Sequence, residues 1–219
     1  YFADKISDSA SECLVENYNL ITLRLDEIAK QIRHIPSGIP VLKEGLMSGF
    51  PRIYAIAVEF IDFTAGIVTQ DALVQFLQDY QKQTPLTVDE LWSVSCAFSL
   101  ALARNILALA GRRCAALYAE NTASQAAKEL CTGNTARFEL SQHININDAT
   151  ELAALIRYVQ SDAENTKALR LLDAELASRG ITASNVLDFA RHIETNCSVT
   201  VQNSITSLMK LQSFDWEDI

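Results

Sequence analysis

The sequence predicts an all-α protein, either a multi-helix bundle or an irregular array of helical hairpins, with about eight to ten helices. Only 7 of the 219 residues are glycine and 4 are proline, whereas a sheet protein of this size would need many turns rich in these residues. Alanine and leucine, which favour helices, are abundant. Apolar residues also recur at helical spacing, and no segment is predicted as a strand.

The first helix is predicted over residues 8–34. Its apolar side chains recur every three or four residues and form one stripe, which is made of Leu14, Tyr18, Ile21, Leu25, Ile28 and Ile32. Pro36, Gly38 and Pro40 follow and end the helix.

A second helix is predicted to begin at Pro51, because proline suits the first turn of a helix. The segment PRIYAIAVEFIDF is apolar on nearly every side, which predicts that this helix lies inside a bundle. Gly66 is expected to end it in a left-handed conformation.

Three later helices share one start pattern, in which a threonine is the N-cap: Thr69, Thr87 and Thr182. An apolar residue precedes each threonine and another follows four residues after it, as in a hydrophobic staple. These pairs are Val68 and Leu73, Leu86 and Leu91, and Ile181 and Val186. Thr87 and Glu90 also fit the capping box, in which each residue bonds the backbone of the other.

The remaining helices have weaker boundary signals. They are predicted over 134–144, 149–160, 165–179 and 199–212. Asn147 or Asp148 caps the second of these, and Gly180 ends the third. Residues 87–131 form one long helix or two helices that break near Gly111.

Composition limits the classes of partner. The net charge is −9, with the acidic excess spread over both halves, so nucleic acid and anionic membrane surfaces are unfavourable partners. The 5 cysteines are an odd number without a C-x-x-C pair, which is typical of free thiols. The chain begins without methionine and ends in FDWEDI, which resembles the start of another helix. We therefore expect residues 1–219 to be a single helical region and a fragment of a longer chain, with a sub-division open near 111–133.

Residues 92–110 are apolar and close to the length of a membrane span. Arg104 and Asn105 interrupt this segment, and an arginine at a membrane centre costs about 2.5–3.5 kcal/mol on insertion scales. We therefore predict a buried helix here and no membrane span in this piece.

No motif for hydrolysis, nucleotide binding or metal binding is present, because the H-E-x-x-H, G-x-S-x-G and Walker patterns are absent. His34, His143 and His192 lie far apart in the sequence. The acidic pairs at 26–27 and 89–90 are interpreted as solvated helix faces. We predict no catalytic residue, no cofactor and no metal site in this chain.

Polar residues that lie in apolar segments form a second group of candidates: Arg52, Glu59, Arg104, Asn105 and Asn203. A buried charge needs a partner, so Glu59 is expected to pair with Arg52 or Arg104. Such a network either ties helices together or contacts a ligand.

Four aromatic residues could stack on sugars: Tyr54, Tyr80, Trp92 and Trp216. The alternative for each is packing in the core or in an interface.

Several runs of the sequence share a pattern with one family. Residues 48–94 contain G-x-P-R-x-Y, then Tyr80-Gln81, Thr84-Pro85-Leu86 and Glu90-Leu91-Trp92, and the run VTVQNSITSL is followed by Asp215-Trp216. With CLVENYNLI near the start, these runs resemble the N-terminal cytoplasmic region of cyclic β-1,2-glucan synthases. Ala65-Gly66-Ile67 stands where that family has a D-G-R-like turn.

The resemblance implies a helical region that precedes the membrane segments of a glucosyltransferase that uses UDP-glucose and carries a phosphorylase-like module. It implies a cytoplasmic location at the inner face of a bacterial plasma membrane. The expected partners are other domains of the same parent chain and a β-glucan. No catalytic residue of the family maps onto this chain, because its D-x-D and Q-x-x-R-W motifs are absent here.

Three functions remain in view at this point. The first is a non-catalytic accessory or scaffold region of a carbohydrate-active membrane enzyme, which organises catalytic modules or guides glucan. The second is an autonomous helical domain that binds a partner helix or peptide. The third and weakest is an all-α enzyme with a buried site at Glu59 and an arginine.

Overall fold

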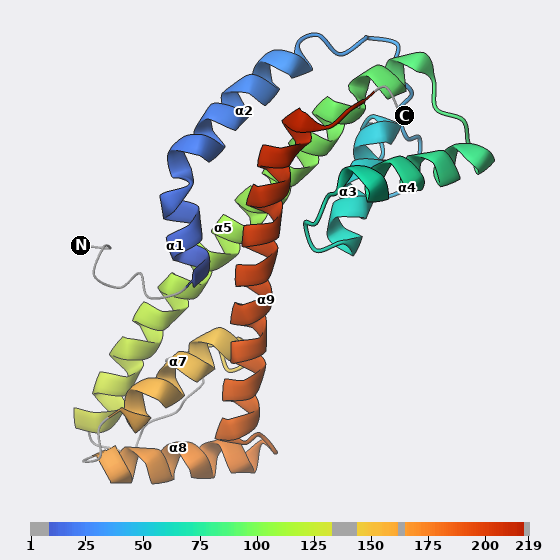
Figure 1. The fold of residues 1–219 in the computed structure, drawn as a ribbon. Coiled ribbons are helices and arrows are strands. Elements are labelled where there is room, and N and C mark those ends of the chain that lie inside the picture. Colours follow the sequence, from blue (N-terminus) through green and yellow to red (C-terminus); the bar gives the residue numbers. More distant parts are fainter. Residues whose placement is uncertain (1–8, 133–143, 162–164, 217–219) are drawn as a thin grey trace. The chain divides into compact units, whose positions relative to one another are not determined.

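The computed structural model describes residues 9–132, 144–161 and 165–216. These residues form eight α-helices, one short 3-10 helix and no strand, which confirms the predicted all-α class (Figure 1). The helix predicted over 134–144 lies, up to residue 143, outside the described residues.

The chain divides into two compact units. The first unit comprises Tyr1–Ala110 and Cys197–Ile219, and the second comprises Gly111–Asn196. The helices of the chain are α1 (Ser9–Glu16), α2 (Tyr18–Ile32), α3 (Arg52–Phe63), α4 (Gln70–Gln83), α5 (Val88–Thr132), α7 (Ala149–Gln160), α8 (Thr166–Ser178) and α9 (Ala183–Lys210), followed by the 3-10 helix η4 (Leu211–Ser213).

The single helix predicted over 8–34 is wrong, because the chain forms α1 and α2 with an interruption at Asn17. The side-chain amide of Asn17 donates to the Cys13 carbonyl at 2.8 Å. The backbone N–H of Asn17 contacts the same carbonyl at 3.2 Å. An asparagine amide that competes with the backbone for a helix carbonyl disturbs the helix at that point.

The choice between one helix and two over residues 87–131 is settled by α5, which runs for 45 residues without a break. Gly111 lies inside it. A glycine costs about 1 kcal/mol in a helix relative to alanine, which a helix of this length tolerates. The segment 199–212 is helical as predicted, but its residues up to Lys210 are the last part of the longer helix α9 and do not form a separate helix.

Helix α5 is the one helix among the described residues that is long and apolar enough to cross a membrane. In the structure, 56% of the apolar 18-residue stretch of this helix is buried. Phe98, Leu102 and Ile106 are fully buried in the core of the first unit. This face of α5 is therefore occupied by contacts with other helices of the unit.

The predicted helix caps are confirmed. Thr69 accepts a bond from the N–H of Ala72 at 3.4 Å, and Thr182 accepts one from Asn185 at 3.3 Å. Asp148, rather than Asn147, caps α7 through two backbone N–H groups. Short polar side chains at these positions satisfy N–H groups that have no partner within the helix.

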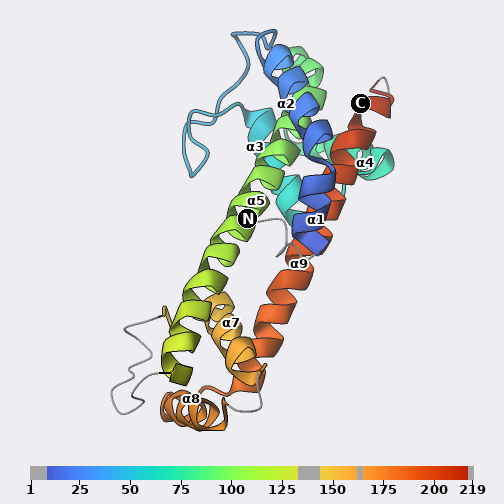
Figure 2. The ribbon, with the colours of Figure 1, turned by 90° about the vertical axis from the view of Figure 1, so that its left-hand side faces the viewer.

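In the first unit, α1 and α2 lie beside the last part of α9 (Figures 1 and 2). The Cys13 thiol donates to the Gln202 side chain at 3.0 Å, and Gln212 donates to Glu27 at 2.8 Å. Helices α3 and α4 pack into the same core, where the ring of Phe60 lies 4.9 Å from Phe76 and 5.6 Å from Phe98.

The second unit has its own core. It is formed by small and aliphatic side chains from the later part of α5, from α7 and α8, and from the start of α9: Ala123, Ala127, Leu130, Leu152, Leu155, Ile156, Leu172, Leu176 and Ala190. Arg157 of α7 and Glu194 of α9 form a two-bond ion pair at its surface, at 2.9 and 3.3 Å.

Candidate functional site

An ion pair joins the start of α3 to the start of α5. Arg52, the first residue of α3, donates from Nε to Oε1 of Glu90 at 2.7 Å and from Nη2 to Oε2. Its Nη2 also donates to the carbonyl of Pro85 at 3.0 Å. A two-bond arginine–carboxylate contact fixes direction as well as distance, so it sets the position of α3 against α5.

Glu90 also closes the capping box that the sequence predicts. Its Oε2 accepts from the backbone N–H of Thr87 at 2.8 Å, and Thr87 Oγ1 accepts from the N–H of Glu90 at 3.3 Å. The side chain of Glu90 is fully buried. The interpretation of residues 89–90 as a solvated helix face is therefore wrong for Glu90.

The pKa of Glu90 reflects two opposing effects. Burial raises the pKa, but the hydrogen bonds from Arg52 and Thr87 favour the carboxylate and hold the pKa below its usual value. The hydrogen bond to Glu90 raises the pKa of Arg52. Both groups are thus held in their charged forms, and their hydrogen bonds join the start of α3 to the start of α5.

The expected pairing of Glu59 with Arg52 or Arg104 is wrong. Glu59 lies on the solvent-exposed side of α3, and Arg104 is exposed on α5, whereas Arg52 pairs with Glu90. A charged side chain that can stay in water has no need of a buried partner. An enzymatic site built on a buried Glu59 is therefore excluded.

A second group of polar contacts lies where the turn between α3 and α4 meets α9. The amide of Asn105 donates to Ser204 Oγ at 3.0 Å, and that hydroxyl donates to the Thr200 carbonyl at 2.7 Å. The Asn203 amide donates to the carbonyl of Ala65 at 3.2 Å. Asn105 and Asn203 thus both tie helices or turns of the first unit together.

The same turn comes very close to α9. The buried N–H of Val68 donates to Ser207 Oγ at 2.9 Å. Gly66 has a φ of +82° and faces Ser204 with no room for a side chain. As predicted, Gly66 adopts a left-handed conformation at the end of the α3 region, and its N–H bonds the carbonyl of Ile61 at 3.0 Å.

Three of the four candidate aromatics pack against other rings. Tyr54 is buried, with its ring 5.8 Å from Phe50, and burial raises the pKa of its hydroxyl. Tyr80 lies 6.5 Å from Phe76. Tyr54 belongs to the core of the first unit, and Tyr80 is partly buried and packs against that core.

Trp216 is half-buried, and its ring lies 5.9 Å from Phe214. The chain around it is held by a reciprocal contact, in which the Gln70 side chain bonds both the N–H and the carbonyl of Asp215. The Asp215-Trp216 pair is therefore also tied to the first unit.

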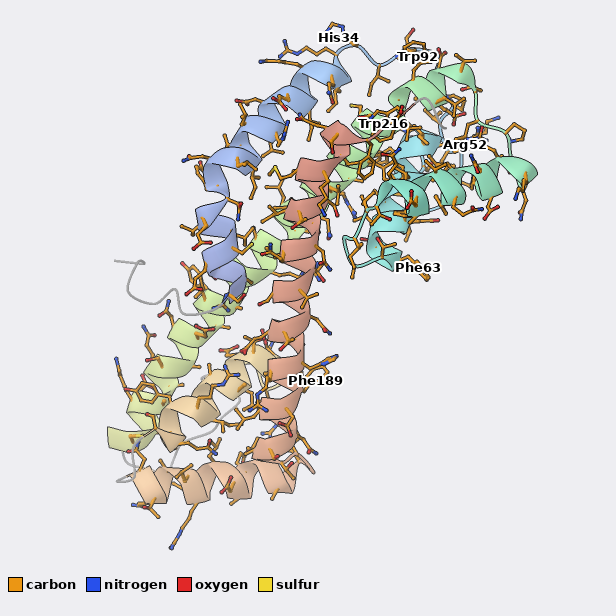
Figure 3. All side chains as sticks on the ribbon, in the orientation of Figure 1. His34, Arg52, Phe63, Trp92, Phe189 and Trp216 are labelled. Atoms are coloured by element: carbon orange, nitrogen blue, oxygen red, sulfur yellow. The ribbon has the colours of Figure 1, made fainter. Side chains whose placement is uncertain are left out.

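Trp92 differs from the other three aromatics, because 82% of its surface is exposed. It lines a shallow pocket of about 570 Å³ between the end of α2 and the start of α5, at the side of the molecule where Figure 3 labels His34 and Trp92. The pocket is lined by Gln31, His34, Ile35, Pro36, Val88, Asp89, Trp92, Ser93, Ser95 and Cys96. Burial raises the pKa of the Cys96 thiol, so the thiol stays protonated at neutral pH.

The sequence named Trp92 as a candidate but missed the residues opposite it. Gln31, His34 and Pro36 come from a segment more than fifty positions earlier, and only the packing of α2 beside α5 brings them near the tryptophan. Among the described residues, no group of three or more histidine, cysteine or acidic side chains is placed to hold a metal ion.

Comparison with known proteins gives a distant similarity. No protein-family model matches the chain. The chain is similar to the cyclic beta-(1,2)-glucan synthase NdvB of Rhizobium meliloti (strain 1021), with 21% identity over 215 residues. The match covers 94% of this chain but only 8% of the length of that relative. The chain is thus weakly related to one region of a glucan synthase.

Proposed function

We propose that this chain is a non-catalytic accessory region of an enzyme that resembles cyclic β-1,2-glucan synthases. In this role it organises the catalytic modules of its parent chain or guides the growing glucan. One observation carries the proposal: the similarity to NdvB of Rhizobium meliloti runs through 94% of the chain and is not confined to one motif.

The contacts of the first unit support an architectural role. Arg52 and Glu90 belong to the runs that carry the family resemblance. They bond each other, and Glu90 also accepts a hydrogen bond from the backbone N–H of Thr87 at the start of α5. Asn203 and Ser204 belong to the later run, and they bond the α3–α4 turn and Asn105. Polar groups that pair with one another between helices stabilise a fold, and Glu90 and Ser204 are buried in these contacts.

The same proposal gives the region a place and partners. It lies in the cytoplasm at the inner face of a bacterial plasma membrane, next to membrane-spanning parts of its parent enzyme. Its partners are other domains of that chain, and the parent builds its glucan from UDP-glucose.

The proposal is tested by incubating the purified 219-residue chain with radiolabelled UDP-glucose and a glucan acceptor. We expect neither sugar transfer nor release of UDP above the buffer control. Turnover that co-purifies with the folded chain would overturn the non-catalytic role. Loss of that turnover in Glu90→Gln, with helicity unchanged, would place the chemistry at the ion pair.

A second candidate function is an autonomous domain that binds a partner helix or peptide. The exposed aromatic side chains Trp92 and Phe63 favour it, since 82% and 91% of their surfaces are open to solvent. Capture of a soluble protein that is unconnected with glucan synthesis, and loss of that capture in Trp92→Ala or Phe63→Ala, would support this alternative.

A further inference from the structure

We propose that the pocket between the end of α2 and the start of α5 is a binding site for a β-linked glucose oligosaccharide, with Trp92 as the surface on which a sugar ring stacks. The identity of the ligand rests on the proposed function, while the position of the site rests on the geometry of the pocket.

Trp92 is placed as a stacking surface. Its indole ring is exposed although it is large and apolar, whereas the other three candidate aromatics are buried or half-buried against neighbouring rings. One face of a β-linked glucose ring carries mainly C–H groups, and such a face packs on an indole while the hydroxyl groups point sideways. An exposed tryptophan in a concave site therefore fits a pyranose ring.

The helical turn that carries Trp92 is held in place by neighbouring residues. Trp92 comes two residues after Glu90, which is fixed by Arg52 and by the capping box with Thr87. The turn of α5 that carries the indole is thus anchored to α3 and to its own N-terminus. Binding sites on anchored helices hold their side chains more accurately than sites on loops.

The rim of the pocket supplies polar groups that suit hydroxyl groups. Asp89 accepts hydrogen bonds, Gln31 both donates and accepts, and His34 does either according to its tautomer. All three side chains are exposed. They come from both sides of the pocket, so a ligand lying on Trp92 would meet hydroxyl partners from α2 and from α5.

The charge of the pocket favours a neutral ligand. Among the described residues that line it, Asp89 is the one acidic side chain, and none is a lysine or an arginine. A nucleotide sugar or another phosphate-bearing ligand would place negative charge near Asp89 without a basic partner. The volume of about 570 Å³ lies within the usual range for small-ligand pockets, about 300–1,000 Å³.

The test uses the two tryptophans of the chain. In Trp216→Phe, Trp92 is the only indole, so its fluorescence reports the pocket alone. Short linear β-1,2-linked glucose oligosaccharides are titrated into this variant, and in parallel into the ¹⁵N-labelled wild-type chain. We expect a saturable fluorescence change at millimolar sugar, and amide shifts confined to Gln31, His34 and the first turns of α5.

Matched variants locate the site. Trp92→Ala should weaken sugar binding at least about tenfold while the helicity and unfolding midpoint stay unchanged, because the ring is mostly exposed. Phe63→Ala removes an even more exposed aromatic of the same unit outside the pocket, and this variant should bind as the wild type does. α-1,4-Linked glucose oligosaccharides should bind at least several-fold more weakly.

Three results would overturn the inference: no saturable change with the β-1,2-linked sugars, binding that survives Trp92→Ala, or self-association of the chain that covers Trp92 in the absence of sugar. Each of these would leave the non-catalytic accessory role standing, because the UDP-glucose assay tests that role separately.

Discussion

A Cβ atom added to Gly66 would lie 2.2 Å from the hydroxyl oxygen of Ser204 and 3.1 Å from its backbone nitrogen. The turn between α3 and α4 therefore passes directly against α9, although the two residues are more than a hundred positions apart. A side chain at residue 66 would therefore force either the Ser204 hydroxyl or the backbone around it to move. Through this contact, the position of α3 and α4 depends on the segment of α9 that contains Ser204.

We predict that Gly66→Ala destabilises the first unit by about 1–3 kcal/mol more than Gly45→Ala does, because alanine overpacks a closed contact. Both glycines have a positive φ, +82° and +86°, but nothing lies within 4 Å of a Cβ at Gly45. The Gly45→Ala control therefore introduces the backbone strain of a positive φ without any steric overlap. Urea unfolding followed by tryptophan fluorescence measures both variants, since Trp92 and Trp216 both lie in the first unit. Equal losses in the two variants would show that the contact with α9 is loose.

We predict that Ser207→Ala costs about 1–3 kcal/mol, because it leaves the buried N–H of Val68 without its acceptor. The matched control is Ser48→Ala, whose hydroxyl is exposed and bonds the Lys43 carbonyl at 3.0 Å. Water replaces that bond, so the control should change the free energy of unfolding by less than about 0.5 kcal/mol. If the two serine variants unfold at the same urea concentration, the bond from Val68 to Ser207 does not hold the turn.

The pKa of Glu90 predicts a loss of stability in acid. Its pKa is lower in the folded chain than in the unfolded chain, where it is about 4.3. The ionised carboxylate therefore contributes its full stabilisation above the unfolded pKa and loses it as the pH falls through the folded pKa. Wild-type stability should fall more steeply than that of Glu90→Gln below about pH 4.5. Parallel curves for the two proteins would contradict the low pKa.

Sequence reasoning predicted the parts of this fold that depend on neighbours in the chain. Thr87 and Glu90 are three residues apart, and Thr69 and Ala72 likewise, so each cap is visible as a local pattern. The interruption at Asn17 was missed because the apolar stripe continues across it. The side-chain bond of Asn17 to the Cys13 carbonyl leaves no trace in that pattern.

The candidate site depends on contacts that a local pattern does not contain. Arg52 and Glu90 are 38 positions apart, and the choice of Glu90 over Glu59 follows from which face of α3 meets α5. The amide of Asn105 and the hydroxyl of Ser204 are 99 positions apart. The polar rim opposite Trp92 comes from α2, so only the packed structure combines the indole with Gln31 and His34.

The most direct measurement is a double-mutant cycle on Arg52 and Glu90. The variants are Arg52→Met, Glu90→Gln and the double variant, each unfolded in urea at neutral pH and followed by tryptophan fluorescence. Breaking a buried pair leaves a charge without its partner and costs about 3–5 kcal/mol, so we expect Arg52→Met to be the least stable of the three.

If the residues that carry the family resemblance hold the architecture together, the double variant will be more stable than the sum of the single losses predicts, with a coupling energy of about 1–3 kcal/mol. Single losses that add to within about 0.5 kcal/mol would contradict this, because they would show that Arg52 and Glu90 act independently.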